Sequence, residues 1–455
     1  MTYDLFIAEK SQLEGNFGFE PSFLPDFLFD FQKDLVAWAV KKGRAAIFAD
    51  CGMGKTLMEI VWAENVARHT GKPVLILTPL AVAHQFVKEA AKFGLDVSHS
   101  KDGRIESNIV VCNYERLHYF NCNDFSGTVC DESSILKNFD GVRKAEITEF
   151  MREQKYRLLG TATASPNDYT ELGTSSEALG YLGYMDMLSR FFTNKQQTSK
   201  QMRGRFGGND KWRFKGHAEQ NFWRWVASWA RAVRSPADMG YDAGDFILPP
   251  LVVNECVITP DTPPDGMLFA LPAIGLQEQR AERSRTFQER CQKVADIVNS
   301  REGASIVWCN LNKEADLLES LIDGAVQVSG QDNDEQKEDK FTAFSDGEIK
   351  VLITKPKIGA WGMNWQHCSH MTYFPTNSYE QYYQAVRRSW RFGQENPVIV
   401  DIVATSGEKP VIDNMKKKQD QADRMFTELV SHMMDSINID RKHIYNKPVE
   451  VPKWL

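Results

Sequence analysis

Short, continuous runs of apolar residues alternate with longer stretches of helical spacing over the first third of the chain. Such runs occupy residues 45–48, 74–77, 109–112, 127–130 and 156–159, with helical patterns at 56–67 and 82–93. A strand that is apolar at every position is buried on both faces, and intervening helices place such strands parallel. The pattern predicts an α/β unit built on a parallel sheet with helices on both faces.

The pattern stops near residue 168 and resumes near residue 250. The intervening segment shows no strand alternation. It holds an apolar stretch of helical spacing (179–192), a basic and glycine-rich stretch (195–215) and an aromatic helix (222–229). Apolar runs then return at 251–258, 304–308, 349–353, 370–374 and 398–403, with a helical pattern at 286–299. We therefore expect four parts. An N-terminal α/β lobe (1–167) is followed by a helical insertion with a basic and aromatic loop (168–248). A second α/β lobe (249–415) and a C-terminal helix and tail (416–455) complete the chain.

Composition and charge narrow the class of protein. Of the 455 residues, 42% are hydrophobic and 25% are charged, which is typical of a soluble protein of two or three domains. No apolar run approaches the ~20 residues of a membrane-spanning helix, and the N-terminus lacks the basic region of a secretory signal. The eight cysteines include no Cys-x-x-Cys pair, so we expect a reducing, cytosolic compartment and no membrane contact. The net charge of −7 means that any nucleic-acid surface has to be local.

A phosphate-binding loop follows the first expected strand. The segment 50–56 reads Asp-Cys-Gly-Met-Gly-Lys-Thr and opens the first expected helix. Gly52 and Gly54 let backbone N–H groups face phosphates at the positive end of the helix dipole. Lys55 would neutralise phosphate charge, and the Thr56 hydroxyl would bind Mg²⁺. The Gly-Lys-Thr order between a strand and a helix argues against a chance glycine turn.

Two carboxylates, Asp131 and Glu132, follow another expected strand of the same sheet. An isolated acidic pair is most often a solvated loop. At the carboxyl end of a strand beside a phosphate loop, however, such a pair lies where ligands bind in these sheets. We expect Asp131 to hold Mg²⁺ and Glu132 to orient and deprotonate the attacking water.

The second lobe carries a pair of arginines. Residues 384–394 read Gln-Ala-Val-Arg-Arg-Ser-Trp-Arg-Phe-Gly-Gln, and Arg388 and Arg391 would share one helical face. Two such arginines could reach a γ-phosphate across a cleft. The alternative is an ordinary basic helix face. We disfavour it because a nucleotide site in the first lobe needs positively charged partners.

Together these motifs resemble the superfamily-two helicases and translocases, most closely the Swi/Snf-like branch, in a compact form like the DEAD/DEAH-box helicases of phages or bacteria. The order of motifs matches over roughly residues 29–405, at 31–32, 50–56, 77–80, 112–115, 131–134, 159–167, 354–364 and 384–394. The resemblance implies two tandem RecA-like lobes that bind ATP and Mg²⁺ in the cleft between them.

The resemblance also implies roles for single residues. Gln32 would read adenine, and Gly362 and Gln384 would contact the nucleotide. The residues that would touch nucleic acid are Thr78, Pro79, Asn113, Tyr114 and Thr354. Two departures from the family pattern stand out: Ser134 replaces a histidine that links hydrolysis to nucleic-acid binding, and Cys51 replaces an acid in the phosphate loop.

The insertion has two readings that the sequence leaves open. Lys211, Trp212 and Arg213 combine basic and aromatic side chains, which suit phosphates and bases. They could equally form a solvated loop whose aromatics pack on the helices. A second aromatic group falls close to helical spacing and is expected to form core, namely Phe222, Trp223, Trp225 and Trp229. The cluster 367–370 lacks the spacing of a metal site and is expected to be structural.

We therefore expect a nucleic-acid-dependent ATPase motor that translocates on or remodels DNA, with duplex DNA favoured and single-stranded DNA or RNA as other substrates. We expect it in the cytosol of a bacterium or a phage-infected host. One alternative is a strand-separating DNA or RNA helicase. Another is an ATP-gated clamp without turnover, which Ser134 and an exposed-looking tail from Lys416 would favour.

Overall fold

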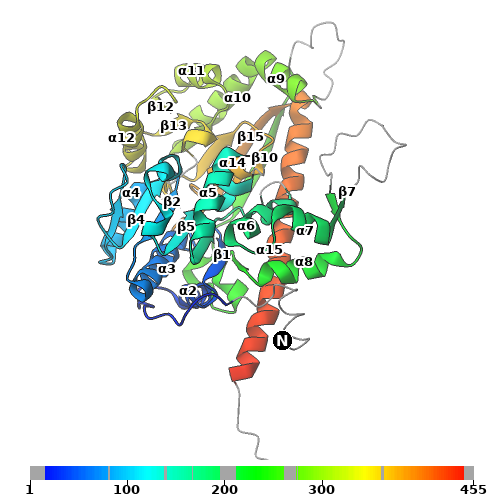
Figure 1. The fold of residues 1–455 in the computed structure, drawn as a ribbon. Coiled ribbons are helices and arrows are strands. Elements are labelled where there is room, and N and C mark those ends of the chain that lie inside the picture. The colour runs from blue at the N-terminus through cyan, green and yellow to red at the C-terminus, as the bar shows by residue number, and fades with distance from the viewer. Residues whose placement is uncertain are drawn as a thin grey trace, which may run out of the picture.

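Two parallel sheets, one in each lobe, form the frame of the protein (Figure 1). The computed structural model describes residues 16–79, 82–137, 141–165, 168–194, 212–260, 273, 275–359 and 363–444. Helices pack on both faces of each sheet, so the expected α/β class with two parallel-sheet lobes is confirmed.

The first sheet has seven strands in the order β3-β4-β2-β5-β6-β1-β9, all parallel. They are β1 (Arg44–Ala49), β2 (Val74–Thr78), β3 (Val97–His99), β4 (Ile109–Asn113), β5 (Gly127–Asp131), β6 (Tyr156–Gly160) and β9 (Ala230–Val233). Alternate residues of the central strands pack on opposite faces. One face meets α2 (Asp30–Lys42), α3 (Lys55–Thr70) and α4 (Ala83–Lys92), whereas the other meets α5 (Val142–Glu153) and the insertion.

The insertion contains strands that the sequence pattern did not predict. Its helices are α6 (Leu172–Leu179), α7 (Tyr184–Phe191) and α8 (Ala218–Ala227), and β7 (Phe192–Asn194) pairs antiparallel with β8 (Trp212–Phe214). Strand β9 then returns to the first sheet and pairs in parallel with β1. The expectation of a strand-free segment is therefore wrong, because a four-residue Ala-Arg-Ala-Val strand is too short to show alternation and is specified by the open edge of β1.

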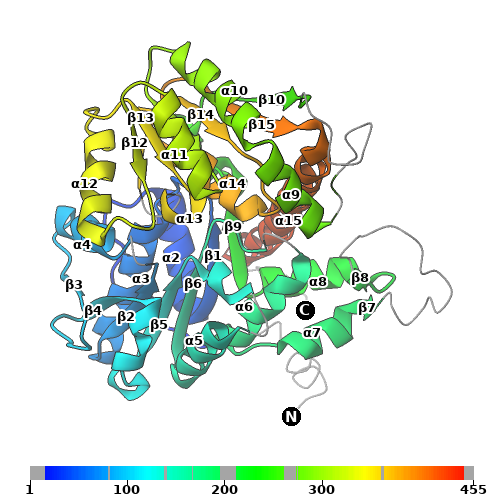
Figure 2. The same cartoon turned by 90° about the horizontal axis from the view of Figure 1, so that it is seen from above.

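The aromatic helix of the insertion packs as core, as expected. Its rings are at most 2% exposed and belong to the same apolar cluster as alternate residues of β1 and β2, namely Phe222, Trp223, Trp225 and Trp229. Figure 2 shows α7, α8 and the β7–β8 hairpin projecting to one side of the first sheet.

The second sheet has six parallel strands in the order β10-β15-β14-β11-β13-β12. They are β10 (Leu251–Ile258), β11 (Ser305–Trp308), β12 (Ala325–Val328), β13 (Val351–Thr354), β14 (His370–Tyr373) and β15 (Val398–Thr405). The helices of this lobe are α9 (Leu276–Arg285), α10 (Phe287–Asn299), α11 (Asn312–Leu321), α12 (Asp334–Ser345), α13 (Pro356–Gly359) and α14 (Tyr379–Val386).

A long final helix, α15 (Lys409–Ile444), starts in the second lobe and runs across the first (Figure 1, orange to red). Its residues Met425, Phe426, Leu429 and Met433 are buried in the apolar clusters of the first lobe. They form one stripe of the helix, with charged residues around it. The expectation of an exposed tail from Lys416 is thus wrong for the described part of this helix.

Candidate nucleotide-binding site

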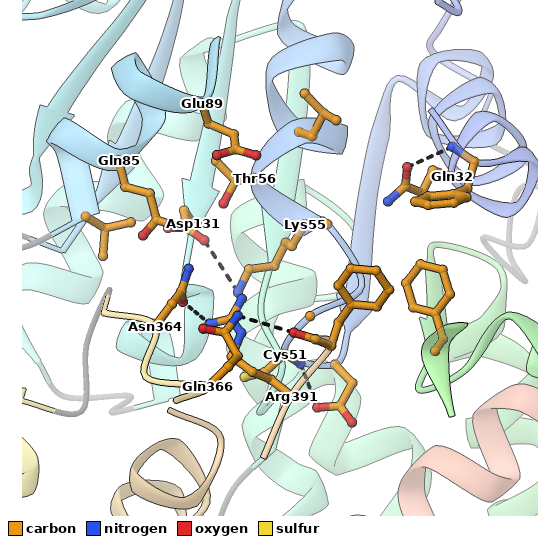
Figure 3. A pocket seen from close by; sticks show the side chains of 18 of the residues that line it. Gln32, Cys51, Lys55, Thr56, Gln85, Glu89, Asp131, Asn364, Gln366 and Arg391 are labelled. Carbon is orange, nitrogen blue, oxygen red and sulfur yellow. Dashed lines mark hydrogen bonds and ion pairs between the residues drawn. The ribbon is translucent and has the colours of Figure 1, made fainter. Parts of the chain in front are cut away.

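The phosphate loop joins the end of β1 to the start of α3, at the carboxyl edge of the first sheet. Gly54 has φ +76° and caps α3, a left-handed conformation that favours glycine. A Cβ atom at Gly54 would overlap Nε2 of Gln32. Gln32 Nε2 donates to the Met53 carbonyl at 2.9 Å, and Oε1 accepts from the Phe29 N–H at 3.0 Å. Gln32 therefore lies on the cavity wall, with one end of its amide supporting the loop and the other capping α2 (Figure 3).

Lys55 lies at the start of α3 and points at the acidic pair. Its Nζ is 2.7 Å from Glu132 Oε1 and 3.5 Å from Asp131 Oδ1 (Figure 3). Burial disfavours the charge, but the attraction of Glu132 and Asp131 outweighs it and raises the pKa of Lys55. The ammonium is thus permanently charged and held where a phosphate oxygen could replace the carboxylates.

Asp131 ends β5 and is 2% exposed. Burial raises the pKa of its carboxyl to about 6, against the opposing attraction of Lys55. Thr78 Oγ1, at the end of β2, donates to Oδ2 at 3.0 Å, while Oδ1 accepts no hydrogen bond from the described residues. Oδ1 instead faces the Lys55 ammonium at 3.5 Å. A carboxylate oriented in this way, with the Thr56 hydroxyl on the same cavity, fits Mg²⁺, which binds proteins through one or two carboxylates and keeps several waters.

Glu132 has an unusual backbone. Its φ of +53° is the only positive value of a non-glycine residue in the described ranges. Such a conformation costs ~1–2 kcal/mol, and strain of this kind concentrates at functional sites. It turns the side chain back toward Lys55, and Thr161 Oγ1 fixes the other oxygen, Oε2, at 3.1 Å. A carboxylate held from two sides is suited to orient a water molecule.

A third carboxyl group, that of Glu59, lies behind the loop on the next turn of α3. It is fully buried, and neither oxygen has a hydrogen-bond partner among the described residues. Burial, with the negative charge of Asp131 nearby, raises the pKa of Glu59 well above its usual value. Its oxygen fills the space above Gly160, where no side chain would fit.

The second lobe supplies both expected arginines to the same cavity. Arg388 Nη1 donates to the Met363 carbonyl at 2.8 Å and Nη2 to Gln384 Oε1 at 3.1 Å, whereas Arg391 donates to Asn364 Oδ1. Burial lowers the pKa of Arg391 to about 10, so it remains charged at neutral pH. The expected shared helical face is wrong, however, because α14 ends at Val386 and both arginines lie in the turns that follow.

Aromatic rings form the far wall of the cavity, a feature that sequence spacing did not reveal. The rings of Phe246 and Phe392 are 4.7 Å apart, and those of Phe29 and Phe246 are 5.0 Å apart. Because the three come from three distant segments, no local pattern joins them. Flat apolar rings beside a phosphate loop suit a purine base.

The cavity between the lobes has a volume of about 420 Å³. The predicted residues that line it are Gln32, Gly52, Gly54, Lys55, Thr56, Asp131, Glu132, Arg388 and Arg391. Gln384 does not line it and instead supports Arg388 from behind. Gly362 lies outside the described residues, but Asn364 at the end of the same motif and Gln366 just after it reach the cavity (Figure 3).

A second cavity, of about 760 Å³, also lies between the lobes. Of the expected nucleic-acid residues, Pro79 and Asn113 line it. Its basic and imidazole side chains come from both lobes, namely His84, Lys88, His99, Lys101, Arg116, Lys337 and Lys357, with Glu335 and Glu338 as the acids.

The other expected nucleic-acid residues lie elsewhere. Thr78, Tyr114 and Thr354 are buried and support the strands: Thr78 holds Asp131, Tyr114 donates to the Asp131 carbonyl, and Thr354 donates to the Val328 carbonyl at 3.0 Å. Trp212 and Arg213 lie on β8 of the insertion and line neither cavity. Lys211 lies outside the described residues.

His370, in the cluster at 367–370, has hydrogen-bond partners within the second lobe. His370 Nδ1 contacts the Ser305 hydroxyl at 2.8 Å and Nε2 contacts Asp401 Oδ2 at 3.0 Å. No group of three potential metal-binding His, Cys, Asp or Glu side chains occurs in the described ranges. Nor does any helix among the residues described have the length and apolar character to cross a membrane.

Comparisons with known proteins bear on the second lobe. Residues 289–393 match the model of the helicase conserved C-terminal domain. No curated protein matches the chain. Among solved structures, the chain is similar to the Sulfolobus solfataricus SWI2/SNF2 ATPase core in complex with dsDNA, with 15% identity, a TM-score of 0.41, and coverage of 94% of this chain and 98% of that one. The predicted resemblance to helicases is thus confirmed over residues 289–393 of the second lobe.

Proposed function

We propose that this chain is a nucleic-acid-dependent ATPase motor that translocates on or remodels DNA. The observation that carries the proposal is the meeting, in one cavity between the lobes, of a phosphate loop, an acidic pair and two arginines. The first two come from lobe one and the arginines from lobe two. Hydrolysis at a site completed by both lobes can couple the chemical step to lobe closure.

Each group has a role in phosphoryl transfer to water. Lys55 would leave the acidic pair for the phosphates, which frees Glu132 to accept the proton of the attacking water. Thr161 would keep the Glu132 carboxylate in place during that exchange. Arg388 and Arg391 would stabilise the charge that develops on the transferred group. Thr56 and Asp131 would hold Mg²⁺, which neutralises phosphate charge.

The second cavity is where we propose that nucleic acid binds. Both lobes line this cavity, so a change in the separation of the lobes moves the side chains that would contact a phosphate backbone. Its cations suit phosphate contacts, which position a nucleic acid without reading its sequence. Duplex DNA is our favoured substrate by family resemblance, and the cytoplasm is the compartment we propose.

A triplex-displacement assay tests translocation. We expect the protein to remove a third strand from duplex DNA only with ATP and Mg²⁺, and Glu132→Gln to abolish removal while binding ATP. Strand separation of a forked duplex, run in parallel, distinguishes a helicase from a translocase. If the protein binds ATP and DNA tightly but neither displaces the third strand nor separates the fork, the motor function is refuted and the clamp without turnover is favoured.

A further inference from the structure

One face of α14 is turned toward the first lobe. Glu380, Tyr383 and Arg387, which caps the helix, are spaced three and four residues apart and therefore share a face. All three contact residues of lobe one. Gln384 and Arg388, one residue further along, instead bond to each other and to Met363 in lobe two. The first set thus contacts lobe one, whereas in the second set Gln384 supports Arg388, which lines the cavity.

The main target of this face is Asp50, the first residue of the phosphate loop. Asp50 is 4% exposed. One oxygen of its carboxylate forms an ion pair with Arg387, and the other accepts a hydrogen bond from the Tyr383 hydroxyl. The second oxygen also accepts the N–H of Cys51 at 2.6 Å. The carboxylate thus ties the loop's own backbone to the second lobe.

A second link grips the other catalytic segment of lobe one. Lys137 lies at the end of the 3₁₀ turn Ser133–Lys137, which follows Glu132, and it contacts Glu380. The segments that carry Lys55 and Glu132 are therefore both attached to one face of α14. Attachment at two points restrains rotation as well as separation of the lobes.

Arg387 is itself fixed within the second lobe. Its Nη1 donates to the Trp390 carbonyl at 2.9 Å, and its guanidinium stacks over the Trp390 ring at 4.5 Å. Trp390 Nε1 in turn donates at 2.7 Å to the carbonyl of Pro249, in the connection that enters lobe two. Arg387 therefore connects the phosphate loop to the turn that presents Arg388 and Arg391.

We propose that Tyr383 and Arg387 are positioning residues, which hold the phosphate loop through Asp50 at the distance from Arg388 and Arg391 that hydrolysis needs. The inference rests on the proposed ATPase function of the cavity. The buried charges of Asp50 and Arg387 neutralise each other only when the lobes are together. Truncating one member of such a pair costs free energy, because it leaves the other charge buried and unpaired. The contact consequently favours a closed arrangement before nucleotide binds.

The test measures lobe separation and turnover independently. Fluorophores placed through non-natural amino acids at the exposed Tyr119 and Glu348 report the separation of the lobes by energy transfer, without nucleotide. We expect Tyr383→Phe and Arg387→Gln to lower the transfer efficiency. We also expect kcat for ATP to fall by about tenfold or more while KM changes little, because ATP binds mainly to lobe one. Arg387→Lys, which keeps the charge but not the fork, should recover part of kcat.

Two further variants keep the outcome decisive. Asp50→Asn combined with Arg387→Gln removes both charges, so it leaves no unpaired buried ion and should match Arg387→Gln alone. Arg234→Gln breaks an exposed 3.1 Å ion pair between Arg234, directly after β9, and Asp423 of α15. It should change neither readout, since exposed ion pairs contribute little to stability.

Unchanged transfer efficiency and kcat in Tyr383→Phe and the double variant would overturn the inference. A wild-type protein that does not hydrolyse ATP, but whose lobes separate in these variants, would instead overturn the proposed function and leave the lobe contact standing.

Discussion

The conformation of Gly54 makes a sharp prediction about ATP binding. In Gly54→Ala, the new methyl group meets two penalties. The residue has φ +76°, which disfavours any side chain, and its Cβ would overlap Gln32 Nε2. Gln32 would have to move, and its 2.9 Å hydrogen bond to the Met53 carbonyl would break. The loop backbone that faces the phosphates would lose its support from α2.

The magnitude follows from three contributions: the left-handed conformation, the lost hydrogen bond of Gln32 and the overlap. The left-handed conformation costs ~1–2 kcal/mol for a residue with a Cβ. Loss of the Gln32 bond costs ~1 kcal/mol, and the overlap adds ~1 kcal/mol or more. The last two contributions are specific to the loop. If the loop moves to relieve them, ~2 kcal/mol is lost from nucleotide binding, which corresponds to about 30-fold weaker ATP affinity.

Gly71→Ala is the matched control. Gly71 caps the other end of the same helix with φ +66°, and a Cβ there would meet nothing within 4 Å. This variant should lose ~1–2 kcal/mol of stability to the left-handed conformation alone and bind ATP like the wild type. Titration calorimetry with ATP and thermal unfolding separate the two effects. Equal ATP affinity in Gly54→Ala and Gly71→Ala would refute the role given to Gln32.

Three other predictions follow. Burial lowers the pKa of His370, so the unfolded chain takes up a proton first as the pH falls, and the free energy of unfolding should drop below about pH 6.5. Urea unfolding should show that the stability of His370→Gln depends less on pH between about pH 7 and 5. The same pH dependence as in the wild type would contradict this. Leu429→Ala removes a fully buried side chain that attaches α15 to lobe one and should cost ~2–5 kcal/mol of unfolding free energy; a loss below 1 kcal/mol would show that α15 is not packed there. Arg116→Gln, in the second cavity, should weaken duplex DNA binding and reduce the slope of log affinity against log salt by about one; an unchanged slope would place the DNA elsewhere.

Local sequence predicted the elements whose burial is uniform. The strands β2, β4, β5 and β6 are buried at every position, so their apolar runs were sufficient to identify them. The phosphate loop follows β1, which is buried except at its first residue, and Asp131 ends β5, so both motifs could be placed at the carboxyl edge of the sheet. The charge and the packing of each motif agree with its place in the sheet.

What the sequence did not predict depends on partners far along the chain. Tyr383 lies 333 residues from Asp50, so nothing near either residue indicates their contact. Strand β9 is specified by the free edge of β1, and the burial of α15 by an apolar surface that lobe one and the insertion build together. Spacing did place Arg388 and Arg391 near the cavity, but on a helix that in fact ends two residues before Arg388. Periodicity predicts which positions share a helix face, but it does not fix the residue at which the helix ends.

The most direct test of the central claim is steady-state ATP hydrolysis, measured without nucleic acid and with duplex, forked and single-stranded DNA and RNA, for the wild type and Glu132→Gln. The account predicts Mg²⁺-dependent turnover that duplex DNA stimulates and that the variant loses while still binding ATP. Binding of ATP without hydrolysis by the wild type, on every nucleic acid tried, would contradict it.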